Sequence, residues 1–515
     1  MTPRSAPLPV LVAVVCLGTL VASCGGSSTS PPPPPAPYLY AATDGVAGWE
    51  LWATDGTAAG TGMVKDIRPG PEGSNTWMAS IVGDPPAPGD PVFLCADDGV
   101  HGNELWRSDG TADGTVLVKD IAPGAASAVQ DCILLRAGGR LFFPADDGVH
   151  GAELWTTDGT EAGTTMIRDI QPGAAGSAPD WFFAVNGRAV FLADDGVHGR
   201  ELWSSDGTSG GTDLVADIDG APTSTPLFRY GQAIVDGILY FEADDGAHGD
   251  ELWRTDGTTA GTALVKDAIL GSIPSTVSRI VGLGGTVLFF EQDMTSSDMG
   301  LWRSDGTEGG TTLLHLFSQS WVEHVFGSIL LFTATDGVTG YELWRTDGTV
   351  DGTFLVKDIN PGSASSTPYF LLEHGGLVYF SADDGTHGSE LWSTDGTEAG
   401  TSLVKDVNPG AAGSDPYWLL PRGDAMIMSA SDADHGRELW RSDGTEAGTS
   451  LVKDVNPGTG DFNPWPMSNA EVGGLLLLDG DDGTHGWELW GTDGTEAGTS
   501  MVKDANPGAG DGLSD

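Results

Sequence analysis

A Leu-Trp pair, followed three residues later by Asp-Gly-Thr, recurs ten times in this sequence. Glu precedes nearly every copy, so the motif reads Glu-Leu-Trp-x-x-Asp-Gly-Thr. Its Trp residues stand at positions 52, 106, 155, 203, 253, 302, 344, 392, 440 and 490, with spacings of 42 to 54 residues. This period is typical of four-stranded propeller blades and exceeds that of leucine-rich or hexapeptide solenoids. The chain must therefore fold as an array of similar units.

Each unit contains four short runs of strand-forming residues, clearest in residues 367–410. The runs end in Gly-Gly, Asp-Asp-Gly-x-His-Gly, Asp-Gly-Thr-x-x-Gly-Thr and Asn-Pro-Gly, which supply the backbone angles that tight turns need. The second run is apolar on consecutive residues, so both faces of its strand must be covered. Blades packed face to face around an axis meet this condition. We predict an all-β fold, a β-propeller of ten four-stranded repeats of about 48 residues each.

The sixth unit departs from the pattern, which leaves two arrangements open. Gly300 replaces the Glu, residues 292–298 replace the Asp-Asp-Gly-x-His-Gly turn, and the next spacing shrinks to 42. This unit could be the seam between two five-bladed rings or an irregular blade in one ring of ten. No linker composition marks a boundary there, which favours one continuous array. Neither end of the chain supplies the missing inner strand, so closure by a shared strand is not expected.

The ten motif copies resemble the bacterial ELWxxDGT-repeat family, often labelled hyalin-like, and the resemblance covers residues 38–515. The order of the strands is also similar to that of propellers of the TolB and dipeptidyl-peptidase type. The resemblance implies a secreted or surface propeller. It brings no settled activity and no catalytic residues.

The N-terminus reads as a bacterial lipoprotein signal. Residues 1–23 contain an apolar run and end in Val-Ala-Ser before Cys24, which would carry the lipid. An ordinary signal peptide or a short membrane helix are the alternatives, although the run is shorter than a membrane span needs. Residues 24–37 form a Gly/Ser/Pro-rich tether, and residues 38–515 form the array. Gly25 after the Cys resembles outer-membrane sorting, so we expect a surface-exposed lipoprotein of the outer membrane in the cell envelope.

The charge of the chain excludes several classes of partner. It has 73 Asp+Glu against 23 Lys+Arg, a formal net charge of -50. Such a surface repels phosphate, so we expect no nucleic-acid partner and contact with a membrane through the lipid anchor only. Protein or polysaccharide at the cell surface are the partners that remain.

Many of these carboxylates lie in the repeated turns, which suggests calcium as a cofactor. Hard oxygen ligands in Gly-rich loops suit Ca²⁺, although the spacing matches neither an EF-hand nor a calcium-binding β-roll. The candidate ligands are Asp383, Asp384, Glu390 and Asp395 in one unit and Asp97, Asp98, Glu104 and Asp109 in another. The alternative is that the Asp residues cap turns and that the Glu pairs with a nearby Lys.

The His residues at 101, 150, 198, 248, 387, 435 and 485 are each followed by Gly in the same turn. One His per blade is too far from the next for shared metal coordination, so we expect each to bond a neighbouring Asp. Cys95 and Cys132 remain after Cys16 and Cys24 are assigned to the signal and the lipid. They could pair in an oxidising compartment or stay as two buried thiols.

A second set of aromatic residues precedes or opens the first strand of several units. It consists of Trp77, Trp181, Phe228, Trp321, Tyr369, Trp418 and Trp465. Equivalent positions would lie on one rim, where the rings could stack on sugars or anchor a protein. Packing between blades is the alternative, because the same positions begin apolar strands.

The near-identity of the late units argues for a function of the array. Catalysis needs one asymmetric site, and no motif of a serine hydrolase, zinc protease or phosphate loop occurs. We therefore expect a binding or adhesion scaffold that is not an enzyme. The alternatives are an extracellular propeller hydrolase acting on glycans or peptides, with an irregular cluster near the sixth unit, and a structural coat protein.

Overall fold

The computed structural model describes residues 37–84, 90–220, 231–271, 275–296 and 298–513. The predicted signal peptide, the lipidation site Cys24, nearly all of the tether and the candidate Phe228 lie outside the described residues. Among the described residues, no helix is long and apolar enough to cross a membrane.

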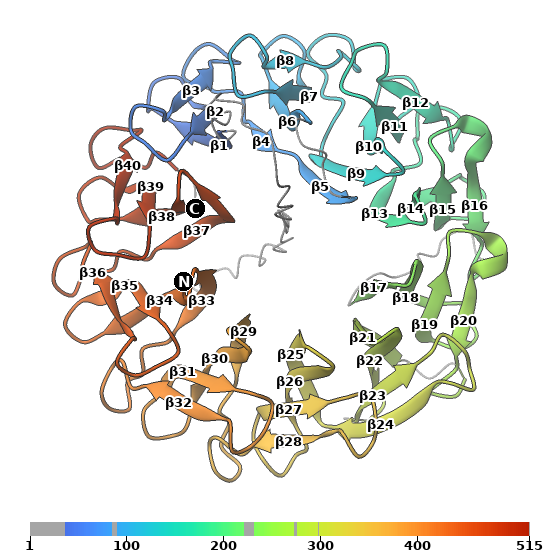
Figure 1. Ribbon diagram of the computed structural model, residues 1–515. Coiled ribbons are helices and arrows are strands. Elements are labelled where there is room, and N and C mark those ends of the chain that lie inside the picture. The colour runs from blue at the N-terminus through green and yellow to red at the C-terminus, as the bar shows by residue number, and fades with distance from the viewer. Residues whose placement is uncertain (1–36, 85–89, 221–230, 272–274, 297, 514–515) are drawn as a thin grey trace, which may run out of the picture.

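The chain forms a single ring of ten blades that follow one another in chain order around a central axis (Figure 1). The predicted all-β propeller is confirmed, and the ten units share one ring. Blades 1 to 3 contain β1 (Tyr38–Thr43), β2 (Trp49–Thr54) and β3 (Gly62–Lys65); β4 (Trp77–Met78), β6 (Val92–Asp97), β7 (Asn103–Ser108) and β8 (Val116–Leu117); and β9 (Ile133–Ala137), β10 (Arg140–Asp146), β11 (Ala152–Thr157) and β12 (Thr165–Arg168). The strand β5 (Ser80–Gly83) joins blade 3 by pairing in parallel with β9.

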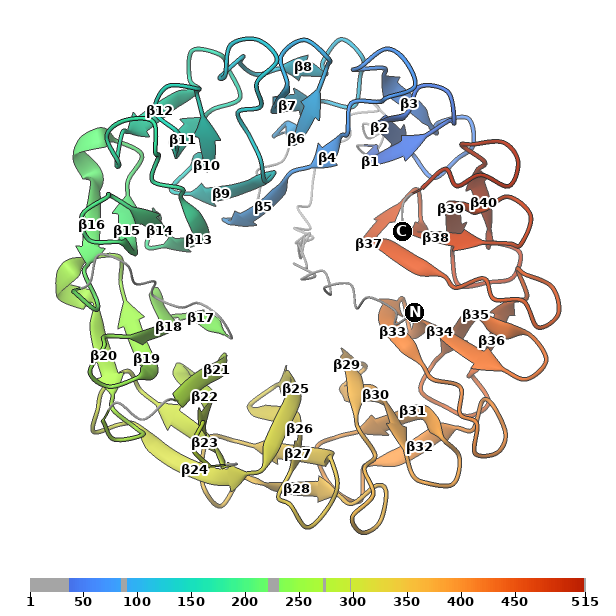
Figure 2. The same cartoon turned by 180° about the vertical axis from the view of Figure 1, so that it is seen from behind.

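Blades 4 to 10 each have four antiparallel strands, the first at the axis and the fourth at the outside (Figure 2). Blades 4 to 6 contain β13 (Asp180–Val185), β14 (Arg188–Asp194), β15 (Arg200–Ser205) and β16 (Thr212–Ala216); β17 (Gln232–Val235), β18 (Ile238–Asp244), β19 (Asp250–Thr255) and β20 (Ala263–Lys266); and β21 (Ser275–Leu283), β22 (Thr286–Asp293), β23 (Met299–Ser304) and β24 (Thr312–Phe317). The 3₁₀ turns η1 (Ser209–Gly211) and η2 (Thr259–Gly261) precede β16 and β20.

The last four blades repeat the same plan with few departures. They contain β25 (Gln319–Phe326), β26 (Ile329–Thr335), β27 (Glu342–Thr346) and β28 (Phe354–Lys357); β29 (Tyr369–His374), β30 (Leu377–Asp383), β31 (Ser389–Thr394) and β32 (Ser402–Lys405); β33 (Tyr417–Arg422), β34 (Ala425–Asp432), β35 (Gly436–Ser442) and β36 (Ser450–Lys453); and β37 (Trp465–Val472), β38 (Leu475–Asp481), β39 (Trp487–Thr492) and β40 (Ser500–Lys503).

The core lies between neighbouring blades. Leu343 of blade 7, for example, packs in one buried cluster with Phe380 and Trp392 of blade 8. The motif Trp is about 5% exposed in most blades, as expected for a core residue. Both faces of the middle strands are thus covered, which explains why their apolar residues do not alternate with polar ones.

A basic residue at the end of the outer strand also joins neighbouring blades. The ammonium of Lys405 donates to the carbonyl oxygen of Thr449 in the next blade at 2.7 Å, and Lys453 does the same to Thr499 at 2.7 Å. In blade 1 the ammonium of Lys65 bonds Thr115 and lies 5.8 Å from the ring centre of Trp106. The repeated Lys therefore bonds the next blade. The alternative from the sequence, in which the motif Glu pairs with this Lys, is wrong.

Among the described residues, the last blade meets the first through backbone and side-chain contacts and not through a shared strand. Blade 1 has three strands among the described residues, and the amide of Thr43 donates to the carbonyl of Gly512 at 3.0 Å. Leu513 is buried beside Tyr40 and Trp52 of blade 1. The same kind of contact joins blades 7 and 8, where the amide of Asp383 donates to the carbonyl of Ser366 at 3.0 Å.

Cys95 and Cys132 form a disulfide, which settles the alternative that the sequence left open. Cys95 lies in β6 of blade 2, and Cys132 immediately precedes β9 of blade 3. The bond therefore fastens two blades at the place where the inner strand is divided into β4 and β5.

Reduction of this disulfide should lower the melting temperature by a few degrees. The cysteines are 37 residues apart, and closing a loop of this length in the unfolded chain is worth about 4 kcal/mol in the chain-entropy model. Cys95→Ser and Cys132→Ser should each match the reduced wild type in differential scanning calorimetry. Melting temperatures that are the same with and without dithiothreitol would contradict this expectation.

Candidate ligand-binding face

The two faces of the ring carry different turns. The Asp-Asp-Gly-x-His-Gly turns join the second and third strands, at the end where Asp383 pairs with Ser389. The Asp-Gly-Thr turns begin beyond Thr394, at the opposite end of the same strand pair. We call the first side the His-turn face, defined by the turns at 97–102, 146–151, 194–199, 244–249, 383–388, 432–436 and 481–486.

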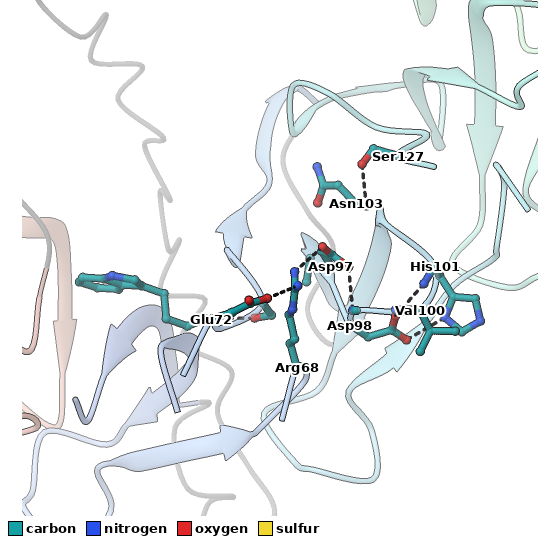
Figure 3. Close-up of polar contacts among 12 residues, drawn as sticks. Arg68, Glu72, Asp97, Asp98, Val100, His101, Asn103 and Ser127 are labelled. Carbon is teal, nitrogen blue, oxygen red and sulfur yellow. Dashed lines mark hydrogen bonds and ion pairs between the residues drawn. The ribbon is translucent and has the colours of Figure 1, made fainter. Parts of the chain in front are cut away.

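Each turn of the His-turn face is held by its own Asp and His side chains, and Figure 3 shows the turn of blade 2. The carboxylate of Asp98 accepts from the amides of Val100 and His101 at 2.8 and 2.9 Å, and its second oxygen lies 2.7 Å from Nδ1 of His101. This hydrogen bond is the main cause that raises the pKa of His101. The expected Asp–His contact is present in all seven turns, with His435 bonded to Asp432.

The neighbouring Asp97 shows how the turns are tied to the loops between blades. Its carboxylate accepts from the amide of Gly99 at 2.7 Å and from the guanidinium of Arg68 at 2.6 Å. Arg68 also bonds Glu72, and the amide of Asn103 donates to the hydroxyl of Ser127 (Figure 3).

The motif Glu, which every blade except blade 6 has, anchors the loop that leads to the next blade. Glu390 is fully buried, and its carboxylate accepts from the amides of Val407 and Asn408 at 3.0 and 3.1 Å and from the hydroxyl of Ser414 at 2.6 Å. Burial raises the pKa of these Glu side chains, to about 7 for Glu104 and Glu438, while the amide bonds act in the opposite direction.

The eight candidate calcium ligands do not converge. Glu390 and Glu104 bind loop amides, while Asp383, Asp384, Asp97 and Asp98 accept from their own turns. Asp395 and Asp109 accept from Thr397 and Thr111 in the Asp-Gly-Thr turns at the other end of the strands. Among the described residues, the group of three acidic side chains close enough to hold one ion is instead Glu201, Asp217 and Asp219 in blade 4.

Of the second aromatic set, the members that the structure describes are exposed, with one exception. The exposed fraction is 69% for Trp77 and 42% for Trp465, and Trp181, Trp321 and Tyr369 are similarly open. Trp418 is a correction to the sequence prediction, because it is 8% exposed and its indole donates to the carbonyl of Pro464 at 2.8 Å. Its neighbour Tyr417 is 40% exposed and takes the position equivalent to Tyr369.

The inner strands of blades 8 and 9 are irregular at the place where these aromatic residues lie. The register shifts between Tyr369 and Leu372 in blade 8 and between Tyr417 and Leu419 in blade 9. The residues within the shifts, Phe370 and Trp418, have φ of 56° and 30°. A bulge of this kind re-aims a side chain, and strained backbone of this type clusters at functional sites.

The aromatic rings form a continuous arc over blades 8 to 10. Ring centres lie 4.5 Å apart from Tyr369 to Phe370, 4.5 Å from Phe370 to Tyr417, and 5.5 Å from Tyr417 to Trp465. Tyr369 pairs with Ser381, two residues before the Asp-Asp-Gly turn, so the arc lies near the His-turn face. We call Tyr369, Phe370, Tyr417 and Trp465 the aromatic arc.

In blade 6 the buried carboxylate comes from the second strand, whereas in the other blades the motif Glu lies in the third strand. In blade 8 Ala382 lies opposite Glu390, whereas in blade 6 Glu291 lies opposite Gly300, so the acidic side chain has moved to the neighbouring strand. Glu291 is 1% exposed, and its carboxyl group interacts electrostatically with that of Glu251 in blade 5. Burial, and then the charge of Glu251, raise the pKa of Glu291 to about 9, and burial raises that of Glu251 to about 7.

No protein-family model matches the sequence, and no curated protein matches it. Solved structures with similar folds include one from a study of two prolyl endopeptidases (TM-score 0.33, 15% identity, covering 67% of this chain and 52% of that chain). Others are puromycin hydrolase (0.32, 16%, 81% and 58%) and oligopeptidase B from Leishmania major (0.36, 11%, 65% and 49%). The chain spans about half the length of these proteins. At such identities and TM-scores, the likeness concerns the propeller fold alone.

The comparison corrects one expectation from the sequence. We expected a protein that is not an enzyme, but the named proteins that share its propeller architecture are peptidases and a hydrolase.

The carboxyl pair of blades 5 and 6 should make the protein less stable at alkaline pH. The pKa values of Glu251 and Glu291 are both raised above that of a free Glu. The protonated pair therefore makes its full contribution to the stability of the fold below about pH 4, and this contribution is lost as the pH rises through about 7 and then 9. Glu291→Ala, which introduces the residue found in most other blades, should make the decline between pH 7 and 9 shallower by up to about 1.4 kcal/mol per pH unit.

The measurement is thermal unfolding at pH 6, 7.5 and 9 at constant ionic strength. Glu446→Ala is the matched control, because Glu446 is an exposed turn residue. Parallel pH profiles for wild type and Glu291→Ala would show that the pair does not titrate as expected.

Proposed function

We propose that the ring binds a neutral or positively charged polysaccharide along the aromatic arc. The observation that carries this proposal is the contiguous row of rings on blades 8 to 10, in which Tyr369, Tyr417 and Trp465 are 40–45% exposed and the partly buried Phe370 links the first two. Aromatic side chains with this exposure are costly to leave in water and usually mark a contact surface.

The chemistry of the face favours sugars. Flat ring faces can stack on the apolar faces of pyranose rings, while the tyrosine hydroxyls and the nearby turn carboxylates can bond sugar hydroxyls. The net charge of -50 disfavours acidic polymers. A lipid anchor at Cys24 would place this surface outside the cell, as the sequence predicts, so the protein would act as a binding or adhesion scaffold in the envelope.

Hydrolysis of the bound polymer is a second candidate function. Catalysis needs an asymmetric group of residues, and the pair of Glu251 and Glu291 beside the divergent blade 6 breaks the tenfold repetition. Both side chains are buried, so substrate would reach them only after movement of the blades.

Removal of one ring from the arc should weaken sugar binding. We expect Tyr417→Ala and Trp465→Ala each to raise the Kd for chitohexaose or cellohexaose about fivefold, because the loss of a stacked ring costs roughly 1 kcal/mol. Isothermal titration calorimetry on the purified protein measures this. Alginate, an acidic polysaccharide, should not bind.

Trp181→Ala is the matched control, since Trp181 is equally exposed but lies in blade 4, outside the arc. Equal losses from Trp181→Ala and Trp465→Ala, or no binding of either oligosaccharide, would refute the proposal. The release of new reducing ends during incubation would favour the hydrolase instead.

A further inference from the structure

Three carboxylates gather in blade 4 at the edge of the His-turn face. Glu201 lies in β15, and Asp217 and Asp219 follow directly after β16. One oxygen from each side chain lies within 4.8 Å of the others. Glu201 is fully buried, Asp219 is half-buried and Asp217 is exposed, so the group reaches from the interior to the surface.

This grouping arises because blade 4 departs from the repeat at two positions. Eighteen residues after the motif Glu, blades 7 to 10 have Asn360, Asn408, Asn456 and Asn506, whereas blade 4 has Asp219. Fifteen residues after the Glu position, seven of the other units have Lys, one has Arg168 and blade 6 has His315, whereas blade 4 has Ala216. Blade 4 has therefore gained an acidic residue and lost the basic one.

The buried Glu of this blade is also less completely bonded than most of its equivalents. In blade 8 both oxygens of Glu390 accept hydrogen bonds, from Val407, Asn408 and Ser414. In blade 4, Oε2 of Glu201 accepts from the amide of Ile218 at 3.1 Å, but Oε1 is buried without a hydrogen-bond partner. An unbonded carboxylate oxygen in the interior is costly unless a cation or a donor compensates for it.

We infer that Glu201, Asp217 and Asp219 bind a divalent cation, and that the cation is Ca²⁺. Three carboxylates supply the hard oxygen ligands that Ca²⁺ prefers, and the exposed position of Asp217 leaves room for water ligands. Mg²⁺ requires a tighter octahedron and gives up its water reluctantly, so it fits an irregular group of loop carboxylates less well.

Burial, followed by the charges of Asp219 and Asp217, raises the pKa of Glu201 to about 8. This site is separate from the aromatic arc, so the inference does not depend on sugar binding.

The test is calcium titration of the EDTA-treated protein by isothermal titration calorimetry, together with thermal unfolding in CaCl₂ or MgCl₂ at matched ionic strength. We expect binding of one Ca²⁺ in this blade and a rise in melting temperature of a few degrees that Mg²⁺ does not reproduce, because only preferential binding to the folded state gives such a rise. Asp219→Asn should abolish both effects. The variant should fold, since four other blades have Asn at this position.

Asp120→Asn in blade 2 is the matched control. Asp120 stands sixteen residues after Glu104, as Asp217 does after Glu201, and Oε2 of Glu104 is likewise unbonded, but Ala122 takes the place of Asp219 and Lys119 is present. The control should keep the calcium response of the wild type. The same response in Asp219→Asn, an equal rise with Mg²⁺, or no binding at millimolar Ca²⁺ would overturn the inference.

Discussion

The buried carboxylate of the repeated Glu-Leu-Trp motif is the contact on which the arrangement of the blades depends. Glu390 lies at the start of β31 and bonds two amides and one hydroxyl in the loop that follows β32. That loop then supplies the carbonyl of Ser414, which accepts from the amide of Ser431 in blade 9. A charged acceptor inside the protein thus fixes the path of the chain between blades, where a flexible glycine-rich loop would otherwise cost much conformational entropy.

Blade 6, which lacks the motif Glu, also shows that this Glu and the loop between blades belong together. There the outer strand β24 is followed, after Ser318, by the inner strand β25, and no long loop has to be held. Gly300 takes the place of the Glu. A Cβ atom at this position would lie 2.6 Å from the indole nitrogen of Trp302, which is too close for a side chain. The motif Glu is therefore absent from the blade that has no such loop to anchor.

The sequence predicted the architecture well, because the architecture follows from features that are local and repeated. The spacing of the Trp residues, the turn signals and the consecutive apolar residues of strands such as Leu377–Asp383 determine blade size and burial. It predicted the site less well. Trp418 and Tyr417 are adjacent aromatics, and only the bulge in β33 decides which is buried. The group of Glu201, Asp217 and Asp219 depends on loop geometry, although the missing basic residue at Ala216 was a visible signal.

The way in which the ring closes has a consequence for how such a protein can change in size. The contact of Gly512 with Thr43 is of the same kind as the contacts between successive blades, so the joint between the last and the first unit needs no dedicated strand. A unit whose last loop is held by its motif Glu can therefore pack against the second strand of another unit, as the loop at Gly512 packs against β1. Duplication or deletion of one repeat would preserve every interface, and only the curvature of the ring would limit the number of blades.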